Sequence, residues 1–181
     1  MKKKDLKPAG VFKYFEEICQ VPRPSKKEEK MIAYLKAFGA KHNLETKVDE
    51  AGNVLIKKPA TPGKENLQTV VLQSHIDMVC EKNNDVQHDF LTDPIETEID
   101  GEWLKAKGTT LGADNGIGVA TELAILADDS IEHGPLECLF TVDEETGLTG
   151  AFALQEGFMS GDILLNLDSE DEGELFIGCA G

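Results

Sequence analysis

The stretch Thr69-Val-Val-Leu-Gln-Ser-His-Ile-Asp77 indicates both the fold class and the position of a functional site. It begins with the apolar, β-branched run 69–72, which is typical of a central parallel strand buried on both faces. His75 and Asp77 follow this run at once. Residues two apart in an extended chain point to the same side, so Asp77 can hold the His75 ring while that ring binds a metal ion. The sequence therefore predicts a metal ligand at the end of a central strand.

Three further segments carry carboxylates where a predicted strand ends or a helix begins: Gly112-Ala-Asp-Asn-Gly116, Asp143-Glu-Glu-Thr-Gly147 and Asn166-Leu-Asp168. Each is ordinary alone, since Asp114 could be a helix N-cap, and Glu144 with Glu145 could be exposed surface. Successive extended residues face opposite ways, so one of the two glutamates could bind metal while the other handles a proton. Histidine and carboxylates from several strand ends are the ligands that a two-metal hydrolase needs. We therefore expect all four segments to meet at one site.

The remaining patterns predict alternating helices and strands. Helices are expected at 11–18, after a capping box formed by Ser25 and Glu28, at 115–127 and at 149–155. Strand pairs are expected within 45–57 and 95–106, and single strands at 136–142, at 163–167 and from 174 onward. This order gives an α/β fold with a largely parallel sheet flanked by helices. Functional sites in such sheets lie outside the carboxyl ends of the strands, where the acidic segments are predicted.

Composition narrows the function further. The 181 residues are 40% hydrophobic, enough for one domain with a core, and no apolar run approaches the roughly 18 residues that span a bilayer. The net charge of −16 argues against nucleic acid or an anionic membrane as a partner. No apolar stretch follows the basic start, so we expect no export signal. The four cysteines are widely spaced, which is typical of reduced, cytoplasmic thiols, and Cys80 is expected to be a packing residue rather than a nucleophile.

The chain resembles the M20 family of metallopeptidases, and within it the aminoacyl-histidine (Xaa-His) dipeptidases. The resemblance rests on 74–83 (SHIDMVCEKN), 112–118 (GADNGIG), 141–147 (TVDEETG) and 166–168 (NLD), and it extends over nearly the whole chain. It implies a zinc-peptidase-like catalytic domain that hydrolyses dipeptides with a water activated by two divalent metals. Zinc is the expected metal, and manganese or cobalt are alternatives.

The resemblance also implies a role for each site residue. The implied metal ligands are His75, Asp114, Glu145 and Asp168, and the implied catalytic residues are Asp77 and Glu144. His75 and Asp168 would bind one metal, Asp114 would bridge both, and Glu145 would bind the second. Glu144 would be the general base, and Asp77 would orient His75. A cis peptide bond is implied between Asp114 and Asn115.

One departure from the family pattern is evident. The family completes its second metal site with a late histidine, after an inserted lid domain, and neither is found within residues 1–181. We therefore expect these residues to be a truncated, N-terminal portion of the catalytic domain, inactive alone, with the lid and C-terminal portion absent. The full-length protein is expected to act on small peptides and to form a possible homodimer. Two alternatives stay open: an M20-like deacylase or amidase acting on N-acyl amino acids, and a binding module without catalysis.

Overall fold

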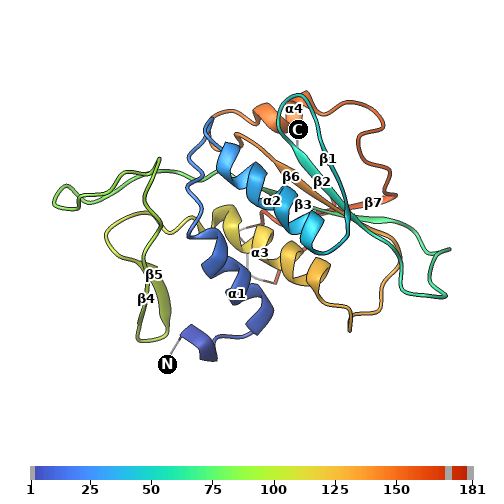
Figure 1. Ribbon diagram of the computed structural model, residues 1–181, viewed down its shortest axis with the longest axis horizontal. Coiled ribbons are helices and arrows are strands. Elements are labelled where there is room, and N and C mark those ends of the chain that lie inside the picture. Colours follow the sequence, from blue (N-terminus) through green and yellow to red (C-terminus); the bar gives the residue numbers. More distant parts are fainter. Residues whose placement is uncertain (1–2, 170–172, 179–181) are drawn as a thin grey trace.

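The computed structural model describes residues 3–169 and 173–178, and its centre is a five-stranded sheet with the order β1-β2-β6-β3-β7 (Figure 1). The strands are β1 (Glu45–Val48), β2 (Val54–Lys58), β3 (Val70–His75), β6 (Leu136–Thr141) and β7 (Ile163–Asn166). β3 lies parallel to both β6 and β7, whereas β1 and β2 run antiparallel to their neighbours. The predicted α/β fold is confirmed, with parallel pairing in the half of the sheet that carries His75.

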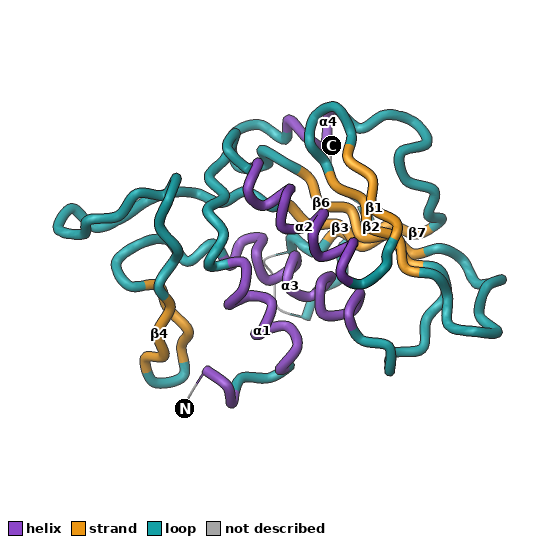
Figure 2. Tube along the Cα trace, in the orientation of Figure 1, coloured by secondary structure: helices purple, strands orange, loops and turns teal. Residues whose placement is uncertain are grey.

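Side chains alternate between the two faces of the sheet and so divide the core. Val54, Ile56, Leu72, Cys138 and Phe140 belong to the main core, with α1 (Ala9–Ile18), α2 (Glu29–Lys41) and α3 (Ala113–Ala127). The intervening Leu55, Val71 and Leu139 form a small cluster on the other face, against Leu154, Phe158 and Met159. Figure 2 shows the three helices together on one side of the sheet. One face is therefore covered by helices and the other mainly by a loop.

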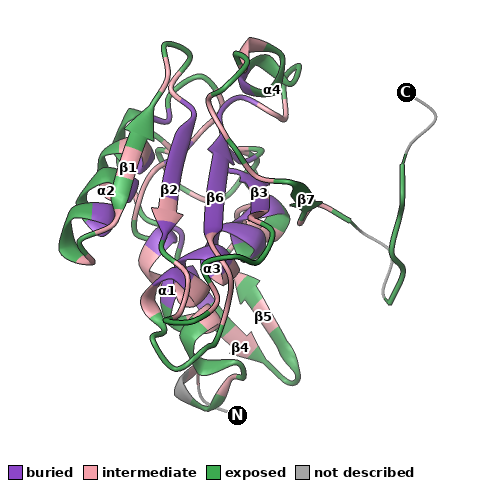
Figure 3. Cartoon of the chain, turned by 90° about the vertical axis from the view of Figure 1, so that its right-hand side faces the viewer, coloured by how far each residue is buried: buried purple, intermediate pink, exposed green. Residues whose placement is uncertain are grey.

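Burial follows this layering (Figure 3). The central strands β2, β6 and β3 are largely buried, and every residue of β6 is buried. All four residues of β7 are exposed, including Ile163, Leu164 and Leu165. The apolar residues of β3 and β6 are therefore mostly buried in the core, whereas those of β7 are exposed. Within the described part of the chain, no helix has the length and apolar character needed to cross a bilayer.

The second helix begins differently from the prediction. A capping box would use the Ser25 hydroxyl on the first turn of the helix, but Ser25 Oγ donates to Asp77 Oδ2 at 2.7 Å. Glu28 takes the N-cap position of α2, and its Oε1 accepts hydrogen bonds from the backbone N–H groups of Lys26 and Asp143. The capping-box prediction is wrong because both side chains are used in tertiary contacts with the site.

The peripheral elements complete the chain. A 3₁₀ turn spans Lys3–Asp5, the hairpin of β4 (Thr97–Asp100) and β5 (Trp103–Ala106) forms its own two-stranded sheet, and α4 spans Thr149–Ala153. The hairpin confirms the turn predicted at 100–101. The strand predicted from residue 174 is wrong for the described residues 174–178, which form no strand and are exposed, because none of them pairs with a described neighbour; Cys179 lies outside the described residues.

Candidate metal centre

His75 ends β3 and is the buried centre of the site. Its side chain is 1% exposed, because β3 lies between β6 and β7 with helices packed on one face. The ring Nδ1 lies 3.2 Å from Asp77 Oδ1, and Nε2 lies 3.1 Å from Asp114 Oδ1. The same Nε2 is 3.8 Å from both Glu144 Oε2 and Asp168 Oδ2. Nε2 therefore faces carboxylates from three other segments, as the sequence predicted.

Asp77 is fixed by four hydrogen bonds. Its Oδ1 faces His75 and accepts the backbone N–H of Glu144 at 3.0 Å, while Oδ2 accepts the Ser25 hydroxyl and the backbone N–H of Glu145. Burial, the largest single influence, would raise the pKa of Asp77, but the hydrogen bonds from His75, Glu144 and Ser25 outweigh it and bring the pKa to about 2. Asp77 is thus an ionised carboxylate that holds both His75 and the two-glutamate turn.

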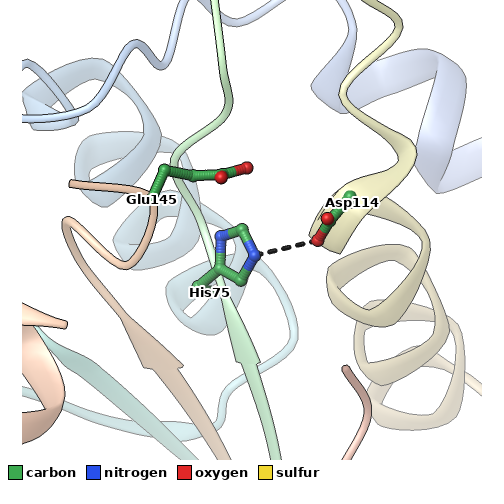
Figure 4. A group of neighbouring side chains, drawn as sticks. All are labelled: His75, Asp114 and Glu145. Carbon is green, nitrogen blue, oxygen red and sulfur yellow. Dashed lines mark hydrogen bonds and ion pairs between the residues drawn. The ribbon is translucent and has the colours of Figure 1, made fainter. Parts of the chain in front are cut away.

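Asp114 reaches the site from the irregular start of α3. Asp114 and Asn115 depart from helical φ and ψ, and the peptide bond between them is cis, which confirms that prediction. The Asp114 side chain is 61% exposed and faces His75 on one side (Figure 4). His75, Asp114 and Glu145 bring one ligand atom each within 4.8 Å of one another. Asp114 is therefore an exposed carboxylate that lies within reach of both His75 and Glu145.

Glu144 and Glu145 lie in the turn that follows β6. Asp143 has a φ of +49°, so the chain leaves the extended conformation before the two glutamates. The expectation that they face opposite ways is therefore wrong, since each supplies an oxygen to a cluster that contains His75. Glu145 groups with His75 and Asp114, and Glu144 groups with His75 and Asp168. The two side chains still occupy different parts of the site.

Asp168 follows β7 and is held by Asn115. The amide Nδ2 of Asn115 donates to Asp168 Oδ1 at 2.5 Å and to the carbonyl of Leu167 at 3.0 Å. Asn115 is itself buried. This contact joins the start of α3 to the end of β7, two segments that are far apart in the sequence.

The site carries more carboxylates than positively charged groups, and this excess shifts their pKa values. Burial, together with neighbouring carboxylates, raises the pKa of Glu144, Glu145 and Asp168. Burial lowers the pKa of His75, but the hydrogen bond with Asp77 and the charges of Asp168 and Asp77 outweigh it, raising the pKa to about 9. Carboxylates crowded in this way favour a nearby positive charge.

The donor set fits divalent cations. One imidazole nitrogen and several carboxylate oxygens are the ligands of catalytic zinc sites, and manganese and cobalt accept them too. His75 Nδ1 faces Asp77, so Nε2 is the nitrogen free to bind, with the supporting carboxylate that metal-binding histidines usually have. A third group of carboxylates, Glu28, Asp77 and Asp143, lies close together but is engaged by backbone and hydroxyl donors.

The other histidines and Cys80 lie outside these groups. His42 packs on Phe38, His88 packs on Phe90, and His133 faces the carbonyl of Gly134. Burial raises the pKa of the Cys80 thiol, which donates to the carbonyl of Met78, as expected for a packing residue.

Sequence reasoning missed three residues that hold the site: Arg23, Ser25 and Asn115. Ser25 was assigned to a helix cap, and Asn115 drew attention only for its peptide bond. Arg23 stands between two prolines, and nothing in its surroundings pointed to the site.

Fold and site together form an α/β domain with a histidine and carboxylates gathered at the carboxyl ends of parallel strands. The chain belongs to the peptidase family M20/M25/M40, whose family model matches residues 71–179. This confirms the resemblance carried by the four acidic segments.

Similar proteins refine the comparison. The cytosol non-specific dipeptidase of Escherichia coli (strain K12) is 53% identical over 97% of this chain, which covers 36% of that protein. The crystal structure of aminoacylhistidine dipeptidase from Vibrio alginolyticus matches with a TM-score of 0.95 and 55% identity over 99% of this chain and 36% of its own. Aminopeptidase PepT from Bacillus cereus matches with a TM-score of 0.76 and 26% identity over 90% of this chain and 43% of its own. The chain thus spans about a third of the length of the two most similar of these proteins.

Proposed function

We propose that the complete protein is a metal-dependent dipeptidase that cleaves small peptides of the Xaa-His type. The observation that carries the proposal is the ring of carboxylates facing His75 Nε2, with Asp114 at 3.1 Å and Glu144 and Asp168 each at 3.8 Å. The similar proteins described as a non-specific dipeptidase and an aminoacylhistidine dipeptidase support the reaction and the substrate class.

Each side chain has a role in this proposal. His75 and Asp168 would hold one divalent cation, Asp114 and Glu145 would hold a second, with Asp114 shared between the two, and Asp77 would orient His75. When bound, such cations polarise a peptide carbonyl and make a water molecule more acidic. Zinc is the metal that we propose.

Glu144 is the proposed general base. Its carboxylate accepts the proton of the attacking water and delivers it to the leaving amine nitrogen. Burial and neighbouring carboxylates raise its pKa, which suits a group that must both accept and donate a proton near neutral pH. Its N–H donates to Asp77 at 3.0 Å, so the group that orients His75 also positions the base.

The wider proposal concerns the complete protein. Residues 1–181 are proposed to be the N-terminal portion of its catalytic domain, with the lid and a further metal-binding histidine in the remainder. Cys19, Cys80 and Cys138 are free thiols, which supports a reducing, cytoplasmic location. A homodimer stays a prediction.

The test compares two neighbouring glutamates in the complete protein. Glu144→Gln should keep both metals and lose about 10²- to 10⁴-fold in kcat, the usual contribution of general-base catalysis. Glu145→Gln should instead lower the metal content. Histidine release from β-alanyl-histidine and elemental analysis measure the two effects. Full activity of Glu144→Gln, or loss of its metals, would contradict the proposed base.

A further inference from the structure

We propose that Arg23 is a positioning residue. Its guanidinium holds the segment that carries His75 and the segment that carries Asp114 at a fixed distance, so that both side chains can bind the metals. The inference rests on the proposed function, because it concerns the same metal centre. Arg23 precedes α2, and its side chain does not contact the proposed ligands directly. It acts through the backbone of the segments that carry them.

Three hydrogen bonds carry the proposal. Arg23 Nη1 donates to the carbonyl oxygens of Ile76 and Asp77, each at 3.1 Å, and Nη2 donates to the carbonyl of Gly112 at 2.6 Å. The first two carbonyls follow His75 directly, and the third lies two residues before Asp114. One planar guanidinium thus joins the end of β3 to the start of α3, and its fixed fork geometry restricts their relative movement.

The glycines of the segment 112–116 leave space for this group. A Cβ atom at Gly112 would lie 2.6 Å from Arg23 Nη2, and one at Gly116 would lie 2.7 Å from the same atom. Gly112 also has a φ of +68°, which side-chain-bearing residues rarely adopt. Both glycines around Asp114 are therefore explained by the approach of the guanidinium, in addition to the turn itself.

Charge supports the same role. Arg23 is 2% exposed, and such a buried cation is stable only when it is well paired. Burial lowers the pKa of Arg23, and nearby anionic groups, among them Asp77 and Glu145, oppose this effect. The adjacent Ser25 hydroxyl donates to Asp77 Oδ2. The loop before α2 thus contacts the His75 segment at two points, through the Arg23 guanidinium and the Ser25 hydroxyl.

Cobalt binding tests the proposal with a readout other than activity. Co²⁺ is titrated into the metal-free complete protein, and its visible absorption bands report both affinity and coordination geometry. Arg23→Met should weaken Co²⁺ binding by about 10- to 100-fold, as changes to groups that orient metal ligands do, and should shift the bands. Arg23→Lys keeps the charge but lacks the planar fork, so we expect it to restore only part of the affinity.

Lys58→Met is the matched control. Lys58 is also a buried cation on carbonyl oxygens, those of Ile125 and Asp128 near the far end of α3 from the site. It should lower thermal stability while leaving the Co²⁺ spectrum unchanged. Circular dichroism checks folding, and if Arg23→Met does not fold, Arg23→Lys carries the test.

The outcomes separate this inference from the proposed function. Unchanged Co²⁺ affinity and bands in folded Arg23 variants would overturn the positioning role alone. Equal weakening in the Arg23 and Lys58 variants would also overturn it, because the effect would then be general destabilisation. If Arg23→Lys bound Co²⁺ as tightly as the unsubstituted protein, a positive charge alone would be sufficient. The proposed role of the planar guanidinium and its three hydrogen bonds would then be wrong. Absence of Co²⁺ binding by the unsubstituted complete protein would overturn the metal centre and this inference together.

Discussion

At the scale of single residues, Asp77 shows how this site is held in shape. An ionised carboxylate offers about four acceptor positions, and Asp77 uses them on His75, Ser25 and the N–H groups of Glu144 and Glu145. The pairing of His75 with Asp77 was predictable, because a spacing of two in extended chain is a local property. The other three bonds join segments that are distant in the sequence, and no local pattern specifies them.

Asn115 gives a residue-scale prediction. Asn115→Ala removes the donor that holds Asp168 Oδ1 at 2.5 Å, so Asp168 should lose its fixed orientation. Metal affinity should fall by about 10- to 100-fold, the usual effect of losing a group that orients a ligand. Isothermal titration with Zn²⁺ measures this effect.

Gln73→Ala is the control for Asn115→Ala. Gln73 also has a side-chain amide; it bonds Thr141 and Asn166 on the two neighbouring strands but no proposed ligand. It should leave Zn²⁺ affinity unchanged. Equal affinity losses in the two variants would count against a specific role for Asn115.

At the scale of elements, the helices and strands that depend on local periodicity were predictable. α1 and α3 follow apolar spacing, and the β4–β5 hairpin follows the Asp100-Gly101 turn. Two expectations were wrong at positions where tertiary contacts, rather than local sequence, determine the conformation. Ser25 bonds Asp77 instead of capping α2, and the two glutamates leave the extended conformation because Asp143 has a positive φ. Apart from the strand expected from residue 174, element identity was thus available from the sequence, while contacts within the site decided how α2 begins and how β6 ends.

Helix α3 gives an element-scale prediction through Glu122. This glutamate is fully buried against β3 and accepts the Ser74 hydroxyl at 2.6 Å, and burial raises its pKa well above the ordinary value. In the unfolded chain it ionises at about 4.3. As pH rises above that value, the unfolded state loses a proton that the folded state keeps, so Glu122 increasingly destabilises the fold, by up to about 1.4 kcal/mol per pH unit.

Glu122→Gln should remove this pH dependence. The free energy of unfolding of the variant, relative to the unsubstituted chain, should rise between about pH 5 and pH 8. Glu137→Gln should show the opposite trend in a lower range: relative to the unsubstituted chain, its free energy of unfolding should fall as pH rises toward about 4.3 and stay level between about pH 5 and pH 8. Burial alone would raise the pKa of Glu137, but the bonds from Lys57 and Ser160 outweigh it and lower the pKa, so its ionised form stabilises the fold above the unfolded pKa. Urea denaturation at several pH values measures the free energy of unfolding of both variants. Identical pH dependence in the two variants and the unsubstituted chain would contradict the opposite pKa shifts of Glu122 and Glu137.

At the scale of the whole molecule, the parallel half of the sheet assembles the site. β3, β6 and β7 end at the same edge, so residues as far apart as His75 and Asp168 meet there. Among the described residues, His75 is the only histidine in the groups of possible metal ligands. All other candidate ligands there are carboxylates, from segments on both sides of the ring. The described site therefore offers one imidazole to what we propose are two cations.

The presence of a single histidine among these candidate ligands leads to a prediction about the chain as a whole. We expect residues 1–181 alone to release no histidine from β-alanyl-histidine, even with excess Zn²⁺, while the complete protein is active. The chain covers only 36% of the length of the similar dipeptidases, and the family resemblance implies a further histidine and a lid beyond the described site. Without them, the proposed second cation would lack a ligand and no lid would close over the substrate. The measurement is histidine release by both proteins at matched concentration and metal content. Turnover by the 181-residue chain close to that of the complete protein would show that the site described here is sufficient, and that a second histidine is not required.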